Sequence, residues 1–465
     1  MDNTGYTPEE PIAAIATALA PAALGIVRTS GKGCIDLVAR LFSRPDALRA
    51  ARGNSLVYGW ICTPAAETAP AQKNRIDEVM LSVYRAPRSF TGEDMVEISC
   101  HGGVSVVTAV YNLLLANGFR AAEHGEFTFR AYINGKTDLT KAEAVREIIA
   151  AKTDVSRSRA AGRLAGHLYQ TIDGVKKLIV DTLAAIEVEI EYPEDEETIS
   201  DTFNPADLEQ ARATLSDLAS SWKSEKIYQD GARVVLCGRT NAGKSSLFNA
   251  LLKEDRAIVS DIAGTTRDWI ESWVNFDGIP ARLFDTAGLR QTDDVIEARG
   301  VALTKDLSQD ADVVLYVVDA RVGLTDDDTA FLKQVKIPVL LVWNKCDVAD
   351  ATAVSVSVTN PATPLRISAK TGAGIAELCA AIKSALTAGK ESARTQTGLG
   401  SERQKVAVEA ALESVTHALA LTKDYTLDAV VQDLEDALDF LGEITGDVTP
   451  EDVLDSVFSH FCVGK

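Results

Sequence analysis

The stretch that most constrains the fold is a glycine-rich turn between an apolar segment and an amphipathic one. It lies in the sequence ARVVLCGRTNAGKSSLFNALL, residues 232–252. The pattern is G-x-x-x-x-G-K-[ST], carried by Gly238, Gly243, Lys244 and Ser245. With a strand before it and a helix after it, this pattern forms a phosphate loop, because glycines let backbone amides close around phosphates at a helix N-terminus. The turn predicts an α/β domain in which Lys244 reaches the β- and γ-phosphates and Ser245 binds Mg²⁺.

Four shorter motifs follow the phosphate loop along the chain, namely DIAGTTRD, DTAG, NKCD and SAK. Asp347 of NKCD can accept hydrogen bonds from N1–H and the N2 amino group of guanine, and a site built on such bonds rejects an analogue that lacks them by roughly 10⁴–10⁵. We expect Lys345 to lie over the base and the Ala369 amide to meet guanine O6. The motifs therefore predict GTP rather than ATP. The other residues predicted to contact the nucleotide are Asn241, Ala242, Gly243, Lys244, Ser245, Ser246, Ser260, Thr265, Thr266, Asp285, Thr286, Ala287, Gly288, Asn344, Ser368 and Lys370.

The residue after DTAG raises the question of how GTP is hydrolysed. Ras-type GTPases use a glutamine there to orient the attacking water, whereas this chain has Leu289. A cation beside the β- and γ-phosphates can stabilise the same developing charge. Asn241 and the segment SDIAGTT, residues 260–266, offer oxygens suited to a monovalent ion. Glu297 is a carboxylate that can orient water; taken alone, the residues favour the alternative that it is a solvated helix residue.

Residues 1–133 are predicted to form a separate α+β domain, because short strands alternate with one clear helix. Strands are predicted at 54–62, 76–86 and 94–100. In the last of these, Val96, Ile98 and Cys100 fall on one face at a period of two residues. A helix is predicted from Val104, ended by Gly118.

Residues 134–230 and 381–465 are predicted to form one helical domain, interrupted by the α/β domain at 231–380. Such an insertion is tolerated because domain termini usually lie close together. Thr140 with Glu143, and Ser401 with Gln404, form capping boxes that open helices. The other helix signals are an apolar stripe from Leu164 to Ile190 that stops before Pro193, a start at Asn204-Pro205, a stripe from Leu434 to Ile444, and Thr449-Pro450 before the last helix.

Charge and cysteine content limit the partners and the compartment. The formal net charge of −20 argues against broad binding to a phosphate backbone, so a nucleic-acid substrate requires a local basic surface or a basic partner. The seven cysteines form no CxxC pair, which favours reduced thiols in a cytoplasm. No apolar run is long enough for a membrane span, and the N-terminus MDNTGYTPEE is acidic, so neither a membrane anchor nor a signal peptide is expected.

Beyond the nucleotide motifs, three further segments carry a resemblance that covers nearly the whole chain. They are SFTGEDMVEISCHGG at 89–103, GEFTFRAYINGKTDLTKAEAV at 125–145 and the terminal FCVGK. With GRTNAGKSSLFNALL and DIAGTTRDWIE, they identify the chain as similar to the MnmE (TrmE) family of tRNA-modification GTPases. One departure concerns the loop before GIVR: this chain has ALAPAAL where relatives usually carry a Gly-rich PPGRGG.

For the nucleotide site, the resemblance implies a K⁺-dependent GTPase. It implies Asn241, Ser260, Ile262 and Thr265 as K⁺ ligands. Ser245 and Thr266 are implied as Mg²⁺ ligands. Glu297 is implied as the residue that orients water, which reverses the preference drawn from the residues alone.

For the rest of the chain, the resemblance implies an N-terminal domain that dimerises and binds 5-formyltetrahydrofolate or a related one-carbon tetrahydrofolate. Arg28, Glu93, Lys136 and Lys465 are implied as folate contacts, the alternative for each being a surface charge. The flavoprotein MnmG is implied as a partner, acting with this chain on the wobble uridine of tRNA. Cys462 lies in the terminal motif and is a candidate substrate-side residue, against the alternative of a packing role. His101 and His460 are expected to be structural.

Two other functions stay open. One is a GTP-gated regulator that has no modification chemistry and whose folate pocket is vestigial. The other is a ribosome-assembly GTPase; such proteins typically add a basic RNA-binding domain, and the acidic terminal helices here argue against it.

Overall fold

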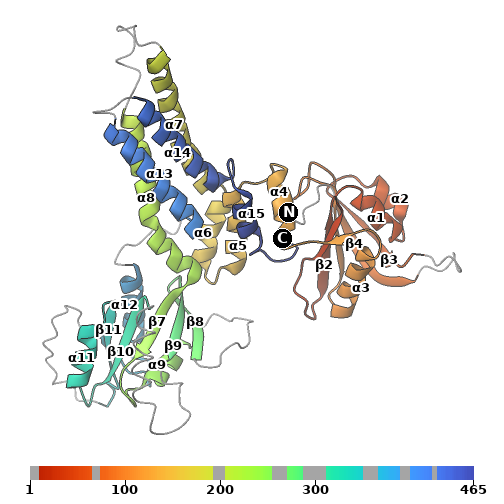
Figure 1. Cartoon of the computed structure of the whole chain (residues 1–465). Helices are drawn as coiled ribbons and strands as arrows, with labels where there is room; N and C mark the ends of the chain where they lie inside the picture. The colour runs from red at the N-terminus through yellow and green to blue at the C-terminus, as the bar shows by residue number, and fades with distance from the viewer. Residues whose placement is uncertain are drawn as a thin grey trace. The chain divides into compact units, whose positions relative to one another are not determined.

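A computed structural model of the chain describes residues 10–64, 74–191, 205–253, 270–285, 311–348, 365–387, 398–421 and 427–464. These residues divide into two compact units, Met1–Arg146 with Leu438–Lys465, and Glu147–Ala437. The architecture is multidomain, with an α+β sheet domain, a set of long helices and a Ras-like α/β domain (Figure 1). The four domain ranges expected from the sequence stay predictions.

The first unit is built on a six-stranded sheet in the order β3-β4-β5-β2-β1-β6. All neighbouring strands are antiparallel except β1 and β6, which are parallel. The three predicted strands are present as β3, β4 and β5. The strands are β1 (Ile12–Ile15), β2 (Leu24–Ser30), β3 (Ser55–Cys62), β4 (Arg75–Tyr84), β5 (Met95–His101) and β6 (Arg120–Ala121).

One face of this sheet is covered by three helices and the other is partly open. The predicted face of β5, with Val96, Ile98 and Cys100, is buried in the core against the helices. On the opposite face Leu56, Tyr58 and other large side chains are exposed, because side chains alternate across a strand. The covering helices are α1 (Cys34–Arg40), α2 (Pro45–Ala50) and α3 (Val104–Leu115).

Three more helices pack around an aromatic cluster that joins distant parts of the first unit. Phe129 of α4 lies edge-on to Phe458 of α15, with ring centroids 5.3 Å apart. Tyr132 adds a hydrogen bond from its hydroxyl to the Gly446 carbonyl. The helices are α4 (Glu126–Ile133), α5 (Leu139–Ala150) and α15 (Glu451–Phe458).

The predicted start of α5, with Thr140 as the N-cap, was wrong by two residues. The helix begins at Leu139, and the carboxylate of Asp138 caps it by accepting a hydrogen bond of 3.0 Å from the Lys141 amide. Thr140 is buried in the first turn, where its hydroxyl donates to the same carboxylate. Asp and Thr both cap helices, so the pattern alone did not distinguish them.

The long helix predicted from Leu164 to Ile190 was also wrong, because two helices share the apolar stripe. α6 (Asp154–Leu164) ends at the first residue of that stripe, and α7 (His167–Glu191) carries the rest. Gly166 lies between them with φ +95°, a left-handed conformation that terminates a right-handed helix. The stripe resumes in phase after the break, so spacing alone did not reveal it.

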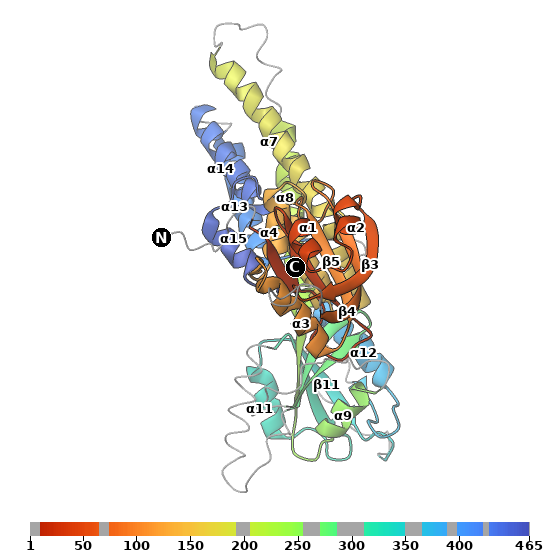
Figure 2. The same ribbon diagram turned by 90° about the vertical axis from the view of Figure 1, so that its right-hand side faces the viewer.

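The last helix begins after Pro450 as predicted, but Thr449 does not cap it: Pro450 is the N-cap, and the Thr449 hydroxyl has no hydrogen-bond partner in the described part of the chain. The other helix predictions agree with the structure. α8 begins at Pro205, α7 ends before Pro193, and α13 begins after Ser401, whose hydroxyl accepts from the Gln404 amide at 3.3 Å. α8 packs against both α7 and α13 (Figures 1 and 2). The long helices are α8 (Pro205–Asp230), α13 (Glu402–Leu421) and α14 (Leu427–Thr445). Within the described ranges, no helix has both the length and the apolar character that a membrane crossing demands.

The second six-stranded sheet has the order β12-β11-β10-β7-β9-β8 and is parallel except for β8 against β9. Separate apolar clusters bury both of its faces, as is usual for a parallel sheet. The strands are β7 (Ala232–Cys237), β8 (Ile270–Phe276), β9 (Ile279–Asp285), β10 (Val313–Asp319), β11 (Val339–Asn344) and β12 (Leu365–Arg366). The described helices are α9 (Lys244–Leu251) and α12 (Ile375–Thr387) on one face and α11 (Asp326–Gln334) on the other.

Candidate guanine-nucleotide site

The glycine-rich turn joins the carboxyl end of β7 to the first turn of α9, as the sequence predicts. Gly238 and Gly243 have φ values of +130° and +95°. A Cβ on Gly238 would lie 2.2 Å from the Val317 carbonyl oxygen, and one on Gly243 would lie 2.2 Å from Asn344 Nδ2. Both positions therefore require glycine for their backbone conformation and for the close approach of neighbouring atoms.

Lys244 lies folded across this loop. Its ammonium group donates hydrogen bonds to the carbonyl oxygens of Gly238, at 2.7 Å, and Arg239, at 2.8 Å. The residue is 8% exposed. The positive charge is thus held inside the loop, where backbone amides at the start of a helix favour phosphate.

The loops after β11 and β12 form a hydrogen-bonded group beside the phosphate loop. Asn344 donates from Nδ2 to the Ala242 carbonyl and accepts at Oδ1 from the Ala369 amide, both at 3.0 Å. Ser368 Oγ donates to Asp347 Oδ1 at 2.8 Å, which orients the carboxylate predicted to read guanine. Because the Ala369 amide bonds to Asn344, its contact with guanine O6 stays a prediction.

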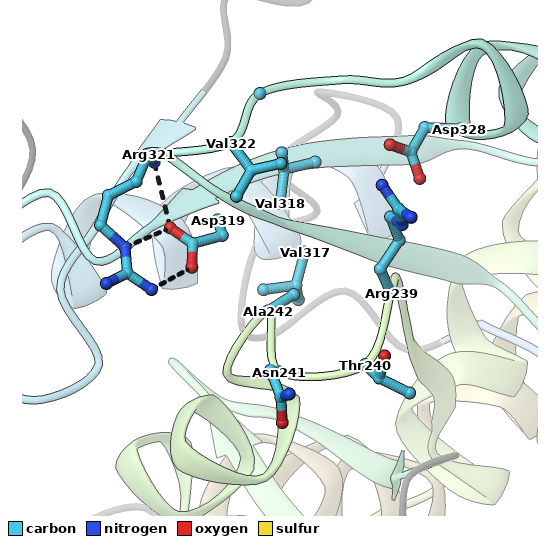
Figure 3. Close-up of a pocket in the computed structure, with 11 residues that line it drawn as sticks. Arg239, Thr240, Asn241, Ala242, Val317, Val318, Asp319, Arg321, Val322 and Asp328 are labelled. Carbon is cyan, nitrogen blue, oxygen red and sulfur yellow. Dashed lines mark hydrogen bonds and ion pairs between the residues drawn. The ribbon is translucent and has the colours of Figure 1, made fainter.

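Two residues that the sequence analysis missed, Asp319 and Arg321, lie at the end of β10. They line a cavity of about 360 Å³ together with phosphate-loop residues 239–242 (Figure 3). Asp319 Oδ2 lies 2.9 Å from Lys345 Nζ. A single aspartate after an apolar strand carries no signal that distinguishes it from an ordinary surface carboxylate, so the sequence did not reveal it.

Several predicted site residues lie outside the described residues. They include the predicted water-orienting residue, most of the predicted cation ligands and the last residue of the chain. These residues are Ser260, Ile262, Thr265, Thr266, Thr286, Ala287, Gly288, Glu297 and Lys465.

The described residues implied as folate contacts lie in the first unit around one end of β2. Arg28 donates from Nε to Glu97 at 2.9 Å and from Nη1 to the Gly464 carbonyl at 3.1 Å. The last described residue of the chain is thus in contact with β2. Arg28 also lies over the rings of Phe90, at 5.1 Å, and Phe127, at 5.3 Å.

Glu93 lies in the same region but already has protein partners. Ser30 Oγ donates to its Oε2 at 2.7 Å, and Arg130 Nη1 lies 3.0 Å from the same oxygen. Ser30 and Arg28 are two residues apart on β2, so they share a face of the sheet. Lys136 lies nearby, since its Cγ is 3.4 Å from a Cβ built on Gly92.

Arg130 is completely buried and holds two carboxylates, Glu93 and Glu126. Burial acts to raise the pKa of Glu126, but hydrogen bonds from Arg120, the Glu123 amide and Arg130 outweigh it and lower the pKa below its usual value. Glu126 therefore stays ionised as part of a buried network of ion pairs.

The remaining candidates are near the surface. Cys462 is exposed, and the residue before it, Phe461, accepts a hydrogen bond at its carbonyl from His124. His101 pairs with Asp77 at 2.8 Å, and His460 Nδ1 lies 2.7 Å from the Ser456 carbonyl. Both histidines have partners within the protein, and their structural role stays a prediction.

The fold and the site together define a P-loop protein of the guanine-nucleotide-binding class. Its phosphate loop lies at the carboxyl edge of a mainly parallel sheet, where ligands of such sheets bind. Asn344 ends β11 at that same edge, and Asp347 and Ser368 lie in the loops that follow β11 and its neighbour β12.

Comparison with known proteins then identifies the family. Residues 139–462 match the MnmE helical domain, and residues 11–136 match the GTP-binding protein TrmE N-terminus. The tRNA modification GTPase MnmE of Treponema denticola is 52% identical over 99% of each chain. The proteins of that name from Treponema pallidum (strain Nichols) and Carboxydothermus hydrogenoformans are 43% and 40% identical, over 99% and 98% of this chain and 99% and 100% of their own. The chain therefore belongs to the MnmE family of tRNA modification GTPases, which are GTP-hydrolysing enzymes.

Proposed function

We propose that this GTPase acts with MnmG on tRNA, adding an aminomethyl or carboxymethylaminomethyl group at C5 of the wobble uridine, and that hydrolysis drives a conformational change. The observation that carries the proposal is that one chain contains both sites. It has a phosphate loop beside the loops predicted to bind guanine, and it has a cluster of charged side chains in its N-terminal part at the positions implied for folate. The test is tRNA modification by the purified chain with MnmG, GTP and a one-carbon tetrahydrofolate. Omission of this chain is expected to abolish product.

K⁺ and Mg²⁺ are proposed as the ions of the nucleotide site. Asn241 supports the K⁺ site, because it lies in the phosphate loop at φ +62° with an exposed side chain that makes no hydrogen bond within the described residues. Ser245, in the first turn of α9, supports the Mg²⁺ site. When bound, the two ions supply positive charge beside the phosphates. GTP turnover is expected to fall at least about tenfold when Na⁺ replaces K⁺ at equal ionic strength, and equal rates would remove the K⁺ role.

Glu297 is proposed to orient the attacking water, with Lys244 stabilising the charge on the phosphates. Glu297→Ala is expected to bind GTP near-normally and to hydrolyse it roughly 10²–10⁴-fold more slowly. Glu297→Gln separates loss of charge from loss of the side chain. A Glu297→Ala rate within about threefold of wild type would return this residue to the solvated-helix interpretation.

Folate binding is proposed for the cluster formed by Arg28, Glu93, Lys136 and the C-terminus. The proposal is supported by a positive charge at Arg28 that aromatic rings enclose, and by a carboxylate at Glu93 held by Ser30 and Arg130. When bound, the folate supplies the one-carbon unit. Titration of the whole protein with 5-formyltetrahydrofolate is expected to give saturable binding that Arg28→Ala weakens. Absence of binding would favour the GTP-gated regulator without modification chemistry.

A homodimer through the first sheet is proposed on the basis of its open face. Leu24, Leu56 and Tyr58 are 64%, 65% and 50% exposed, and Met80 lies directly opposite Tyr58 on the next strand. Exposed large apolar side chains grouped on one face of a sheet are typical of an interface. Tyr58→Glu with Met80→Lys is expected to convert dimer to monomer in analytical ultracentrifugation. Val406→Lys, an exposed apolar position on α13, is the matched control.

Partners and compartment are proposed from the charge and the family. With a net charge of −20, the chain needs a local basic surface or a basic partner to bind tRNA, and we assign much of this binding to MnmG. We expect both in the cytoplasm. Copurification with MnmG supports this assignment, whereas copurification with ribosomal particles alone would favour the ribosome-assembly alternative.

Cys462→Ser is expected to abolish tRNA modification while GTP hydrolysis continues, if Cys462 acts on the substrate.

A further inference from the structure

Asp319 lies between the phosphate loop and the NKCD segment that is predicted to bind guanine. It is the last residue of β10, directly opposite Asn344 in the parallel register with β11. Its side chain is 11% exposed and lines the cavity beside the phosphate loop. Figure 3 shows its carboxylate facing Arg321, with the phosphate-loop residues Asn241 and Ala242 nearby.

The carboxylate is held as an anion by its neighbours. Arg321 donates from Nε to Oδ1 at 3.0 Å and from Nη2 to Oδ2 at 2.6 Å, a two-pronged contact. These hydrogen bonds outweigh the effect of burial and, with Lys345, keep the pKa of Asp319 well below its usual range.

Lys345, the lysine of NKCD, contacts both Asp319 and the phosphate loop. Its ammonium group lies 2.9 Å from Asp319 Oδ2 and donates to the Asn241 carbonyl at 2.6 Å. Because a trans peptide points its C=O and N–H in opposite directions, this contact turns the next amide, that of Ala242, into the loop. There the Ala242 amide donates to the Arg239 carbonyl at 3.3 Å.

We propose that Asp319 is a positioning residue for nucleotide binding, because its carboxylate holds Lys345 against the Asn241 carbonyl. This contact fixes the NKCD segment, which is predicted to bind guanine, relative to the phosphate loop. The inference rests on the guanine-nucleotide site described above and assigns a role to a residue outside its motifs. Lys345 is predicted to lie over the base, which takes no part in hydrolysis, so its contact is expected to be the same in the ground state and in the transition state. Loss of its support is therefore expected to raise KM and Kd together and to leave kcat unchanged.

The test is a double-mutant cycle on the whole protein, with a fluorescent mant-GDP probe for Kd and steady-state GTP hydrolysis for KM and kcat. Asp319→Asn keeps the side-chain shape and removes the charge. It is expected to raise Kd and KM by about tenfold, the loss of one charge-assisted hydrogen bond, with kcat within about twofold. In a Lys345→Ala background, Asp319→Asn is expected to change Kd by less than about twofold, because the partner through which it acts is absent.

Two further variants separate positioning from folding. Asp319→Glu restores the charge and is expected to recover part of the affinity that Asp319→Asn loses. Arg321→Ala removes the half-exposed partner but leaves the ion pair with Lys345, so a rise in Kd of no more than about threefold is expected.

The inference is overturned if Asp319→Asn has its full effect in the Lys345→Ala background, or if it lowers kcat with KM unchanged. If the wild-type protein binds mant-GDP and Asp319→Asn binds it equally well, the inference is overturned, whereas the nucleotide site stands. A wild-type protein that fails to bind mant-GDP overturns the nucleotide site itself, and this inference with it.

Discussion

The two six-stranded sheets of this chain place their candidate sites in different ways. In the mainly parallel sheet, the carboxyl ends of β7, β10 and β11 meet at one edge, so the loops that follow them converge. In the mainly antiparallel sheet, strand ends alternate between edges. Its charged cluster therefore uses side chains on a strand face, such as Arg28, together with a distant helix and the C-terminus. The residues of the first site lie mostly in motifs whose chemistry is apparent from the sequence alone, whereas those of the second were indicated only by resemblance to a family.

The sheets also handle charge differently. The Lys244 ammonium group donates hydrogen bonds to backbone carbonyl oxygens inside the phosphate loop. Arg130, by contrast, is fully buried and is balanced by Glu93 and Glu126. Loss of the first charge is expected to alter ligand binding, and loss of the second to alter folding, because a buried ion left without its partner is costly.

The largest effect is expected at the phosphate loop. Lys244→Ala removes the positive charge held at the centre of the loop, and kcat/KM for GTP is expected to fall roughly 10²–10³-fold. The matched control is Lys253→Ala, at an exposed lysine just after α9, which is expected to leave hydrolysis unchanged. Hydrogen exchange of the β5 amides is expected to be the same in both variants. Faster exchange of the β5 amides in Lys244→Ala would contradict the expectation that loss of this charge alters ligand binding without altering the fold of the first sheet.

The second effect is expected on stability in the first unit. Arg130→Met removes the arginine shared by partly buried Glu93 and buried Glu126, of which only Glu126 keeps a second arginine, Arg120, and the unit is expected to lose about 3–5 kcal/mol. Hydrogen exchange of α4 and β5 measures this loss. Arg157→Met, which removes an exposed ion pair with Asp154, is expected to cost less than about 1 kcal/mol. The affinity for mant-GDP is expected to stay at the wild-type value, and a parallel loss of nucleotide affinity would contradict independent roles.

A smaller effect is expected from pH. The pKa of Glu126 is lower in the folded protein than in the unfolded chain. Its ionisation therefore stabilises the fold above the unfolded pKa of about 4.3, and this contribution is lost as pH falls through the lower, folded pKa. Thermal unfolding of the first unit between about pH 6 and pH 3.5 is expected to show a steeper acid loss for wild type than for Glu126→Gln. Curves of equal steepness would mean that Glu126 does not contribute.

The smallest effect is expected on thiol reactivity, where the two sheets should behave alike. Burial, with a minor contribution from Asp77, raises the pKa of Cys100 in the first sheet to about 11. Burial raises the pKa of Cys237 in the second to about 12, although Lys244 opposes it. Cys462 is exposed. Iodoacetamide at pH 8 is expected to label Cys462 at least about tenfold faster than either buried thiol, by mass spectrometry of native protein. Rapid labelling of Cys237 would indicate that the nucleotide sheet opens.

Particular elements show where sequence reasoning succeeded and where it ended. The start of α8 at Pro205 and the strands β3 to β5 were predicted correctly, because their signals are local. The break at Gly166 was missed because the apolar stripe resumes in phase. Asp319 was missed for a different reason: its partner Lys345 is 26 residues away and meets it only through strand pairing.

The amino-acid sequence by itself determined the phosphate loop, the preference for guanine and the family, since each depends on residues close together in the chain. Only the tertiary structure decided which charges meet. It paired Glu93 with Arg130, brought Gly464 to Arg28 across the length of the chain, and joined Asp319 to Lys345. The physical reason is that backbone conformation responds to neighbouring residues, whereas an ion pair forms wherever packing brings its two partners within a few ångströms.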